Sequence, residues 1–430
     1  MSTREKRFVI TGIGPVSSLG IGSKAMWEGL LKKECGIELT STVFDEEKFE
    51  SYFIHSVRNF DIGNFGFDEQ ALESIRVWKG GEHNKDLLFF LAAVKLALDD
   101  SGIKFNTLEN EFALIISHEN PGLEQLLWKM LTESYQIFAV NSNITRNDYF
   151  NKLYSKIVKL GYETQSFMKL FHIAKIFGIH KYSLFVNNAC ASGQFSLEIA
   201  KDMILCGKSR AVIVVAGDCP DVFKYKWFKT LEMYPGDGKT KPFDKARNGF
   251  LLGEGAVALI LEDFDTAIQR NARIYAEYLG SGFQLESWGI TTPKIGSDYY
   301  AKAIMEAINN SGISKDEIDL VCAHGAATPS SDYYEAKTIQ SIFNKQRVPV
   351  TALKPYVGHN LGGSNLMEIA ILLLALQNNY IPPILNTKVV DGRIPLNLVL
   401  SETKENVKVV LKLCCAFAGF DAATIIRRLD

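Results

Sequence analysis

The residue of this 430-residue chain best suited to covalent chemistry is a cysteine at a sharp corner, Cys190. The apolar run at 184–186 before it is typical of a buried strand. The residues after it place apolar side chains at helical spacing: Phe195, Ile199 and Met203. Small residues around the cysteine permit a tight strand-to-helix turn. Such a turn puts the sulfur at a helix N-terminus, where unpaired N–H groups favour the thiolate. We therefore expect Cys190 to be a nucleophile, although a lone cysteine is more often a buried structural residue.

Three further polar residues lie in turns that follow predicted strands. His324 follows the strand at 318–322, and Lys354 and His359 lie in a glycine-rich loop at 354–363. Active residues of α/β folds gather outside strand ends, so we expect these side chains to meet Cys190. One histidine could activate the thiol of a cysteine hydrolase. Two neutral imidazoles that donate hydrogen bonds would instead suit an enolate oxygen, the species formed when a malonyl thioester loses carbon dioxide. For either histidine alone, a capping or core role is plausible.

The elements that must position these residues form two successive α/β halves, 1–265 and 266–430. Strands are predicted at 8–14, 112–116, 184–186, 211–217 and 256–261, and then at 318–322, 348–352, 407–413 and 423–427. Amphipathic or apolar helices are predicted at 24–33, 86–100, 299–309 and 364–376. Residues 119–180 read as a mostly helical insertion rich in aromatic side chains. Only loops and short elements are predicted for 34–84, a loop for 220–248 and a turn for 414–421. This order indicates an internally duplicated α/β fold.

Composition excludes several classes of protein. A formal net charge of -2 argues against a general nucleic-acid binder. The seven cysteines are odd in number and scattered, and none forms a C-x-x-C metal pair, so we expect a reducing compartment and no metal. The apolar run at 369–376 is too short to span a bilayer, and the N-terminus shows no signal peptide. We expect a cytoplasmic protein without a membrane segment.

Four motifs in register carry a resemblance to a known family. They are Asn187-Asn-Ala-Cys190-Ala-Ser-Gly193, Pro242-Phe-Asp-x-x-Arg-x-Gly-Phe-x-x-Gly-Glu-Gly255, His324-Gly-x-x-Thr-Pro-x-x-Asp-x-x-Glu335 and Lys354-x-x-x-Gly-His359-x-x-Gly. In order and spacing the chain resembles the elongating β-ketoacyl-[acyl carrier protein] synthases. The resemblance extends from Val9 to the last strand. It implies the thiolase fold, in which two related α/β halves stack as five αβαβα layers, usually in a homodimer.

The resemblance also implies a role for each motif residue. Cys190 would accept the acyl chain, and His324 and His359 would assist decarboxylation of a malonyl group and stabilise the enolate. Lys354 would lie behind the histidines and pair with Glu368.

By the same resemblance, the backbone N–H groups of Cys190 and Phe417 would form the oxyanion hole, and Thr328 would help to hold the phosphopantetheine arm. Phe417 would also contact the substrate. The cycle would need no cofactor and no metal, because the substrates are carried on the phosphopantetheine of acyl carrier protein and decarboxylation drives the reaction.

Two departures from the family pattern bear on the substrate. The family has threonine where this chain has Ala326, and its glycine-rich tail reads Cys415-Ala-Phe-Ala-Gly-Phe-Asp421 here. Added side chains at Ala416, Ala418 and Phe420 should stiffen or reshape that loop, which gates the acyl pocket in relatives. We therefore expect decarboxylative condensation in a specialised fatty-acid or polyketide/polyene pathway.

Acyl carrier proteins are acidic, so a basic docking patch is expected. The candidate is the 220–248 loop, with Lys224, Lys226 and Lys229, although a solvated charged loop without a partner is equally plausible.

Three rival functions are considered. One is a non-elongating, chain-length-type subunit of a heterodimeric ketosynthase, a class that typically lacks the active cysteine. The second is a degradative thiolase or other non-decarboxylative thiolase-like acyltransferase, with Cys414 or Cys415 as its second cysteine, or a malonyl-CoA-using plant-type synthase. The third is the cysteine hydrolase. A homodimer is expected, and a heterodimer with a second ketosynthase-like subunit is the alternative.

Overall fold

The computed structural model describes residues 6–44, 47–77, 84–103, 112–119, 122–343 and 348–429. The first five residues, part of the predicted leaderless N-terminus, lie outside these ranges. A 12-stranded mixed sheet runs through the molecule, and β2 (Gly20–Ile21) pairs with β1 beside the main path. The order along that path is β13 (Asn397–Leu398), β12 (Pro349–Thr351), β11 (Leu320–Cys322), β14 (Val409–Cys415), β15 (Phe420–Arg427), β10 (Ala276–Leu285), β1 (Phe8–Ser17), β9 (Gly255–Asp263), β7 (Ala211–Asp218), β5 (Phe112–Ser117) and β6 (Ser183–Val186).

The sheet consists of two five-strand units that repeat one pairing pattern. In the first unit β1 and β9 are antiparallel, β9 and β7 are antiparallel, and β7, β5 and β6 are parallel. In the second unit β10, β15 and β14 are antiparallel in succession, and β14, β11 and β12 are parallel. A short antiparallel pairing of Phe8–Ile10 with Ala276–Tyr278 joins the units. The strands therefore show an internal duplication.

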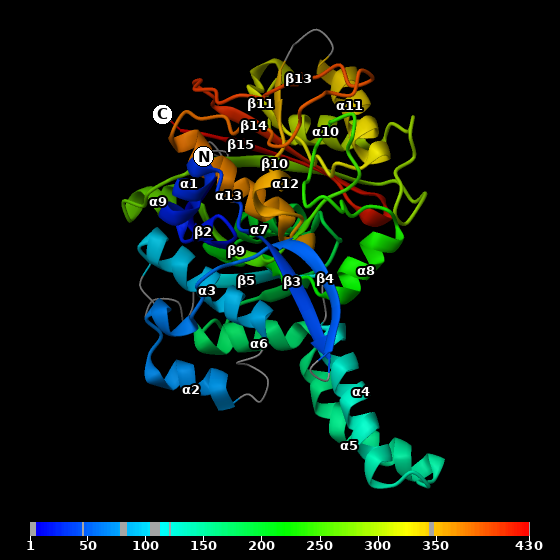
Figure 1. The fold of residues 1–430 in the computed structure, drawn as a ribbon. Helices are drawn as coiled ribbons and strands as arrows, with labels where there is room; N and C mark the ends of the chain where they lie inside the picture. Colours follow the sequence, from blue (N-terminus) through cyan, green and yellow to red (C-terminus); the bar gives the residue numbers. More distant parts are fainter. Residues whose placement is uncertain are drawn as a thin grey trace.

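Helices complete a five-layer arrangement (Figure 1). Between the two units lie α7 (Ser192–Leu205) and α13 (Ser364–Gln377), and α1 (Ser23–Lys32) packs on α13. On the outer face of the first unit lies α3 (Lys85–Ser101), and the second is covered by α10 (Tyr299–Asn310) with α11 (Pro329–Phe343) against it. Every residue of α13 from Ser364 to Leu376 is buried, as a helix between two sheets requires. The expected α/β class and five-layer stack are confirmed.

Between β5 and β6 the chain forms three helices, α4 (Leu123–Val140), α5 (Arg146–Glu163) and α6 (Ser166–Ile176). Figure 1 shows α4 and α5 projecting from the body as a paired arm. The third helix, α6, lies against the body beside β5. Many apolar side chains of this segment are exposed, including Tyr135, Phe138, Val140, Tyr154 and Tyr162. No helix in the described parts of the chain is long and apolar enough to cross a membrane.

The structure differs from the predicted elements in three regions. Residues 34–84 include a hairpin of β3 (Ile37–Phe44) and β4 (Glu47–His55) and a helix, α2 (Glu69–Val77), where only loops and short elements were predicted. The predicted 220–248 loop contains α8 (Val222–Thr230) and ends near β8 (Leu252–Gly253), and α9 (Phe264–Gln269) follows β9. The predicted glycine-rich loop at 354–363 begins with a helical turn, α12 (Lys354–Val357). Tyr225 of α8 stacks on Tyr52 of β4, and β4 pairs with the distant β8, so local pattern did not reveal these elements.

Candidate active site

Cys190 lies at the corner between β6 and α7, as its small neighbours predict. Ala189 adopts a left-handed backbone conformation with φ of 49°, and the Ser192 hydroxyl accepts the Asn188 N–H at 2.8 Å to close the turn. A Cβ added at Gly193 would lie 2.9 Å from Leu366 Cβ. Glycine there allows α7 to pack closely on α13, which follows the His359 loop.

The Cys190 thiol is 5% exposed. Burial and then the Glu119 carboxylate raise its pKa well above the usual value, while Lys354 and a hydrogen bond from the Phe417 backbone lower it. The sequence suggested a more easily ionised thiol at a helix N-terminus. The structure differs because desolvation of the sulfur outweighs the groups that favour the anion. The pKa shift therefore favours a neutral Cys190 thiol.

His324 is held by its backbone and by Lys354. The N–H groups of His324 and Gly325 donate to the Glu335 carboxylate at 2.7 and 2.9 Å. Lys354 Nζ lies 3.2 Å from His324 Nδ1 and donates to the His324 carbonyl at 2.6 Å. An ammonium group can only donate, so Nδ1 accepts and the ring proton resides on Nε2. Burial and then the Lys354 charge lower the pKa of His324 well below its usual value, which keeps the imidazole neutral.

His359 has the same tautomer for a different reason. Its Nδ1 accepts the Leu361 N–H at 3.0 Å and lies 3.0 Å from Ser364 Oγ. The backbone N–H has no acceptor capacity, so the ring proton is again on Nε2. Burial and then Lys354 lower the pKa of His359 well below its usual value. The centroids of the two rings lie 5.8 Å apart, and the ring planes are inclined at 85°. The site therefore holds two adjacent neutral imidazoles, each with one N–H to donate.

Behind the histidines lies a fully buried triad of charges. Lys354 Nζ pairs with Glu368 Oε1 at 3.0 Å, and Lys412 Nζ pairs with Glu368 Oε2 at 2.6 Å. All three side chains are 0% exposed. The Lys354–Glu368 contact agrees with the predicted pair. Lys412 was missed, because a lysine within the apolar run of β14 gives no local sign that it reaches Glu368.

The cysteine and the two histidines line one pocket with an empty volume of about 550 Å³, part of which is open to solvent. Cys190, His324 and His359 share it with Thr328 and Phe417. Its walls also include Glu119, Phe228, Met233, Phe250, Ala326 and the segment 289–293. Residues from separate parts of the chain thus meet at one cavity, in which a thiol and two imidazole N–H donors face largely apolar side chains.

The second and third sequence motifs meet through Arg247 and Asp332. The Arg247 guanidinium donates to the Thr328 carbonyl at 3.1 Å and pairs with Asp391 at 2.8 Å. The Asp332 carboxylate accepts the Phe243 N–H at 2.7 Å. These contacts hold the segment that carries Thr328 in place at the wall of the pocket. The charged residues Arg247 and Asp332 of the two motifs therefore have a structural role.

The C-terminal loop between β14 and β15 closes another side of the pocket. Ala418 has φ of 60°, a conformation that costs a residue with a Cβ about 1 kcal/mol or more. Phe417 packs against Phe228 with ring centroids 5.7 Å apart. Cys414 lies in an apolar cluster with Cys190, and burial raises its pKa to about 12. A thiol with so high a pKa is a poor general base, which argues against the thiolase alternative.

The three lysines of the predicted docking patch all lie on α8 and are all paired. Lys224 Nζ meets Glu119 Oε1 at 2.7 Å at the wall of the pocket, with only 24% of its side chain exposed. Lys226 and Lys229 both pair with Glu50 of β4, and Lys229 does so at 3.3 Å. Lys224 therefore contacts Glu119 of the pocket wall, whereas Lys226 and Lys229 lie on the surface. Glu119 was missed by the sequence analysis, since it follows a strand with no motif around it.

Comparison with known proteins agrees with this arrangement. The family model described as beta-ketoacyl synthase, N-terminal domain, matches residues 5–267, and that of the C-terminal domain matches 275–388. A 3-oxoacyl-[acyl-carrier-protein] synthase 2 from Coxiella burnetii is 25% identical over 99% of both chains. An actinorhodin polyketide putative beta-ketoacyl synthase 1 from Streptomyces coelicolor is 26% identical over 98% of this chain and 89% of its own.

Solved structures show the same architecture. The structure of the ishigamide ketosynthase/chain length factor superposes with a TM-score of 0.85 and 26% identity, over 99% of this chain and 100% of that one. A type II PKS acyl-carrier protein in complex with its ketosynthase gives a TM-score of 0.82 at 23% identity, which shows the fold alone. The family models cover well over half of the sequence and the whole fold is that of the ketosynthases, so this chain belongs to the beta-ketoacyl synthase family.

Proposed function

We propose that this protein is a β-ketoacyl-[acyl carrier protein] synthase that works in two stages. In the first stage the Cys190 sulfur attacks an acyl thioester, the new sulfur–carbon bond forms, and the carrier leaves as a thiol with the proton. In the second stage malonyl carrier protein loses carbon dioxide and its enolate carbon attacks the acyl-Cys190 carbonyl. A carbon–carbon bond forms, the Cys190 sulfur–carbon bond breaks, and the product is a 3-oxoacyl chain two carbons longer.

The observation that carries this proposal is the pair of neutral imidazoles beside the thiol. The Nδ1 atoms of His324 and His359 are both occupied as acceptors, so each ring has an Nε2–H to give. Two such donors can stabilise the negative oxygen of an enolate thioester as carbon dioxide departs. A hydrolase would need one imidazole with a free acceptor nitrogen to activate the water that cleaves the acyl-enzyme.

The tetrahedral intermediate at Cys190 needs its own donors, for which we propose the backbone N–H groups of Cys190 and Phe417. The hydrogen bond between the Phe417 backbone and the Cys190 thiol supports this assignment, since it places that N–H beside the reacting atom. Donors of this kind contribute about 2.7–4 kcal/mol each to transition-state stabilisation.

We propose that Lys354 is a positioning residue and that Glu368 fixes it in place. Lys354 occupies His324 Nδ1 and thereby selects its tautomer, while its charge keeps both imidazoles neutral. Glu368 pairs with Lys354 at 3.0 Å and thereby fixes the position of Nζ beside His324.

The substrates would arrive on the phosphopantetheine arm of acyl carrier protein, with Thr328 and Phe417 as lining residues of the entry pocket. No cofactor and no metal enters this cycle, because loss of carbon dioxide supplies the driving force. The two halves, 1–265 and 266–430, would act as one catalytic unit in the cytoplasm. A homodimer is proposed, with a heterodimer as the alternative, because one similar structure is a ketosynthase/chain length factor.

The test is a condensation assay with acyl carrier protein loaded with acyl chains of several types, followed by malonyl carrier protein. We expect one carbon dioxide and one 3-oxoacyl carrier per turnover, and neither with Cys190→Ala. Hydrolysis of the acyl thioester on the carrier protein to a free acid, without a longer product, would support the hydrolase. If the chain alone were silent and a second ketosynthase-like subunit supplied all activity, the chain-length role would replace this proposal. Fatty-acid and polyketide relatives are about equally similar to this chain, so similarity does not indicate the preferred acyl chain. The assay identifies it by comparing the acyl chains supplied.

A further inference from the structure

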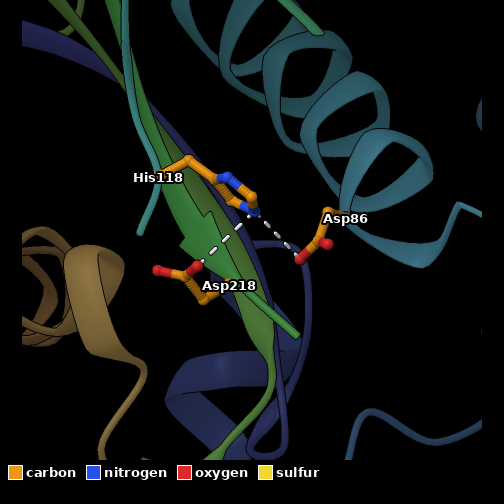
Figure 2. A group of neighbouring side chains, drawn as sticks. All are labelled: Asp86, His118 and Asp218. Carbon is orange, nitrogen blue, oxygen red and sulfur yellow. Dashed lines mark ion pairs between the residues drawn. The ribbon is translucent and has the colours of Figure 1, made fainter. Parts of the chain in front are cut away.

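A second group of polar side chains converges outside the catalytic pocket: Asp86, His118 and Asp218 (Figure 2). Asp86 lies in the first turn of α3, His118 directly follows β5, and Asp218 ends β7, which is parallel to β5. All three are buried, with exposures of 6%, 1% and 1%. Figure 2 shows the imidazole directed between the two carboxylates.

The distances in this cluster do not fit hydrogen bonds. His118 Nε2 lies 3.4 Å from Asp86 Oδ1 and 3.4 Å from Asp218 Oδ1. A charged N–H···O bond is normally about 2.7–2.9 Å long, and one Nε2 proton can serve only one carboxylate well. Within the described residues neither ring nitrogen of His118 has a hydrogen-bond partner. Burying an imidazole with both ring nitrogens unpaired is destabilising, so the site needs a further partner.

The same distances fit three ligands around one cation. The Nε2 atom and the two carboxylate oxygens lie within 4.8 Å of one another. Bonds of about 2.0–2.1 Å in tetrahedral geometry place neighbouring ligand atoms about 3.3–3.4 Å apart. Both observed nitrogen–oxygen separations have that length.

The carboxylates are held in place by backbone groups from the surrounding loops. The Cys219 N–H donates to Asp86 Oδ1 at 2.5 Å, and the Glu119 N–H donates to Asp218 Oδ1 at 3.1 Å. The Gly362 N–H donates to Asp218 Oδ2 at 2.9 Å. Ligands fixed by such outer contacts are preorganised for binding.

The charge of the surroundings leaves room for a cation. Lys169 of α6 is buried and interacts electrostatically with Asp86 and His118. Glu119 acts on His118 from the other side, and its charge is balanced by Lys224. With a neutral imidazole, the two carboxylates and Lys169 sum to one negative charge.

We propose that Asp86, His118 and Asp218 form a structural site for a divalent first-row transition metal, Zn²⁺ or Mn²⁺. One imidazole nitrogen and two carboxylate oxygens are a donor set that suits these ions. The ion would join the ends of β5 and β7 to α3. Through Asp218 it would also fix Glu119 and Gly362, which flank the catalytic pocket and the His359 loop. This site takes no part in the proposed condensation, and its existence does not depend on that function.

Sequence pattern could have indicated this site. Asp86 opens a predicted helix, and His118 and Asp218 each stand at the end of an apolar run. The ends of adjacent parallel strands bring such residues together. The sequence therefore offers these three residues as candidates, and the pairing of β5 with β7 shows that they meet.

The test is metal analysis of full-length protein purified without a metal-affinity step. Inductively coupled plasma mass spectrometry should find close to one Zn²⁺ or Mn²⁺ per chain in wild type. The content should fall at least tenfold in His118→Gln and Asp218→Asn. His180→Gln, which removes an exposed histidine, should retain the ion and serves as the control.

A second measurement does not depend on how the variants fold. Wild-type protein stripped with EDTA should unfold at a lower temperature, and ZnCl₂ or MnCl₂ should restore about 3 °C at about 100 times the ion's Kd. Absence of metal together with no thermal shift from either ion would overturn the proposal and leave a proton shared within the cluster. Equal metal content in the two variants and wild type would also overturn it, by placing the ion elsewhere.

Discussion

Lys354 brings a positive charge into the buried region behind the pocket, where it adds to the effect of burial on the pKa of both histidines. Its side chain is 0% exposed and touches His324 Nδ1 and Glu368. An apolar residue in its place would leave Nδ1 without a donor. A buried cation beside two imidazoles disfavours their protonation, so the site keeps two neutral donors over a wide pH range.

Lys354→Met should therefore change the pH dependence of condensation as well as its rate. The lysine lowers the pKa of both His324 and His359, so its removal should raise those pKa values. The acid limb of the kcat/KM profile for condensation should move to higher pH, with a loss of about tenfold or more at neutral pH. A matched control is Lys302→Met, which removes a half-exposed lysine on α10. A uniform loss with an unshifted profile would mean that Lys354 acts only in packing.

At this scale the sequence predicts residues that sit in local motifs and misses those that do not. Cys190, His324, Lys354 and His359 each stand in a turn whose small or glycine neighbours mark a strand end. Lys412 belongs to the same site, yet it lies inside an apolar strand with no marker. Its role depends on the distant Glu368, and no local pattern contains that contact.

The turn between β14 and β15 is the element in which this chain departs most from its family's pattern. It contains Ala418 in a left-handed conformation and ends at Asp421, which is 0% exposed. Burial and then Glu286 raise the pKa of Asp421 to about 8. A carboxyl group so placed is neutral at pH 7, and its ionisation would put a charge under the loop that carries Phe417.

This turn should make stability depend on pH. An acid whose pKa is about 8 when folded and about 3.9 when unfolded stabilises the fold below about pH 4, and that contribution disappears as pH rises to 8. Asp421→Asn cannot ionise, so its melting temperature relative to wild type should rise between pH 5 and pH 8, by about 4 °C. Thermal unfolding followed by circular dichroism measures this, with Asp99→Asn on the surface as a control. A difference that stays constant with pH would contradict the assignment.

Most elements were predictable where apolar period and length agree, as in β7, α3 and α13. The hairpin of β3 and β4 was not, and β8, the parallel partner of β4, is about 200 residues away. Tertiary contact, rather than propensity, decides such strands. The extent of α8 was hidden for a similar reason, since its lysines suggested a solvated loop while Tyr225 and Phe228 are buried.

For the whole molecule, the duplicated halves explain how motifs far apart in sequence reach one pocket. Cys190 lies just before α7 and the His359 loop leads into α13, and these two helices pack on each other between the units. The outer surface near the pocket is formed partly by α8, with Lys226 and Lys229 exposed beside Phe223 and Trp227. Lysines around exposed aromatic side chains suit an acidic protein partner.

The docking role of α8 can be separated from its role in the pocket. Lys226→Glu with Lys229→Glu should raise KM for carrier-bound substrate about tenfold or more and leave a small thioester analogue unaffected, because only the carrier protein reaches that surface. Lys224 is unsuitable for this test, since it pairs with Glu119 inside the pocket. Charge reversal of Lys302 on α10 is the control. Equal effects on both substrates would contradict docking at α8.

Intact-protein mass spectrometry in two steps tests the central claim most directly. Acyl carrier protein is added first and malonyl carrier protein second, to wild type, Cys190→Ala, His324→Ala and His359→Ala. We predict an acyl adduct on wild type and on both histidine variants, and none on Cys190→Ala. In the second step the adduct should disappear from wild type into a chain two carbons longer, and should remain at least a hundredfold longer on the histidine variants. Loss of acylation in both histidine variants as complete as in Cys190→Ala would contradict the proposed division of roles.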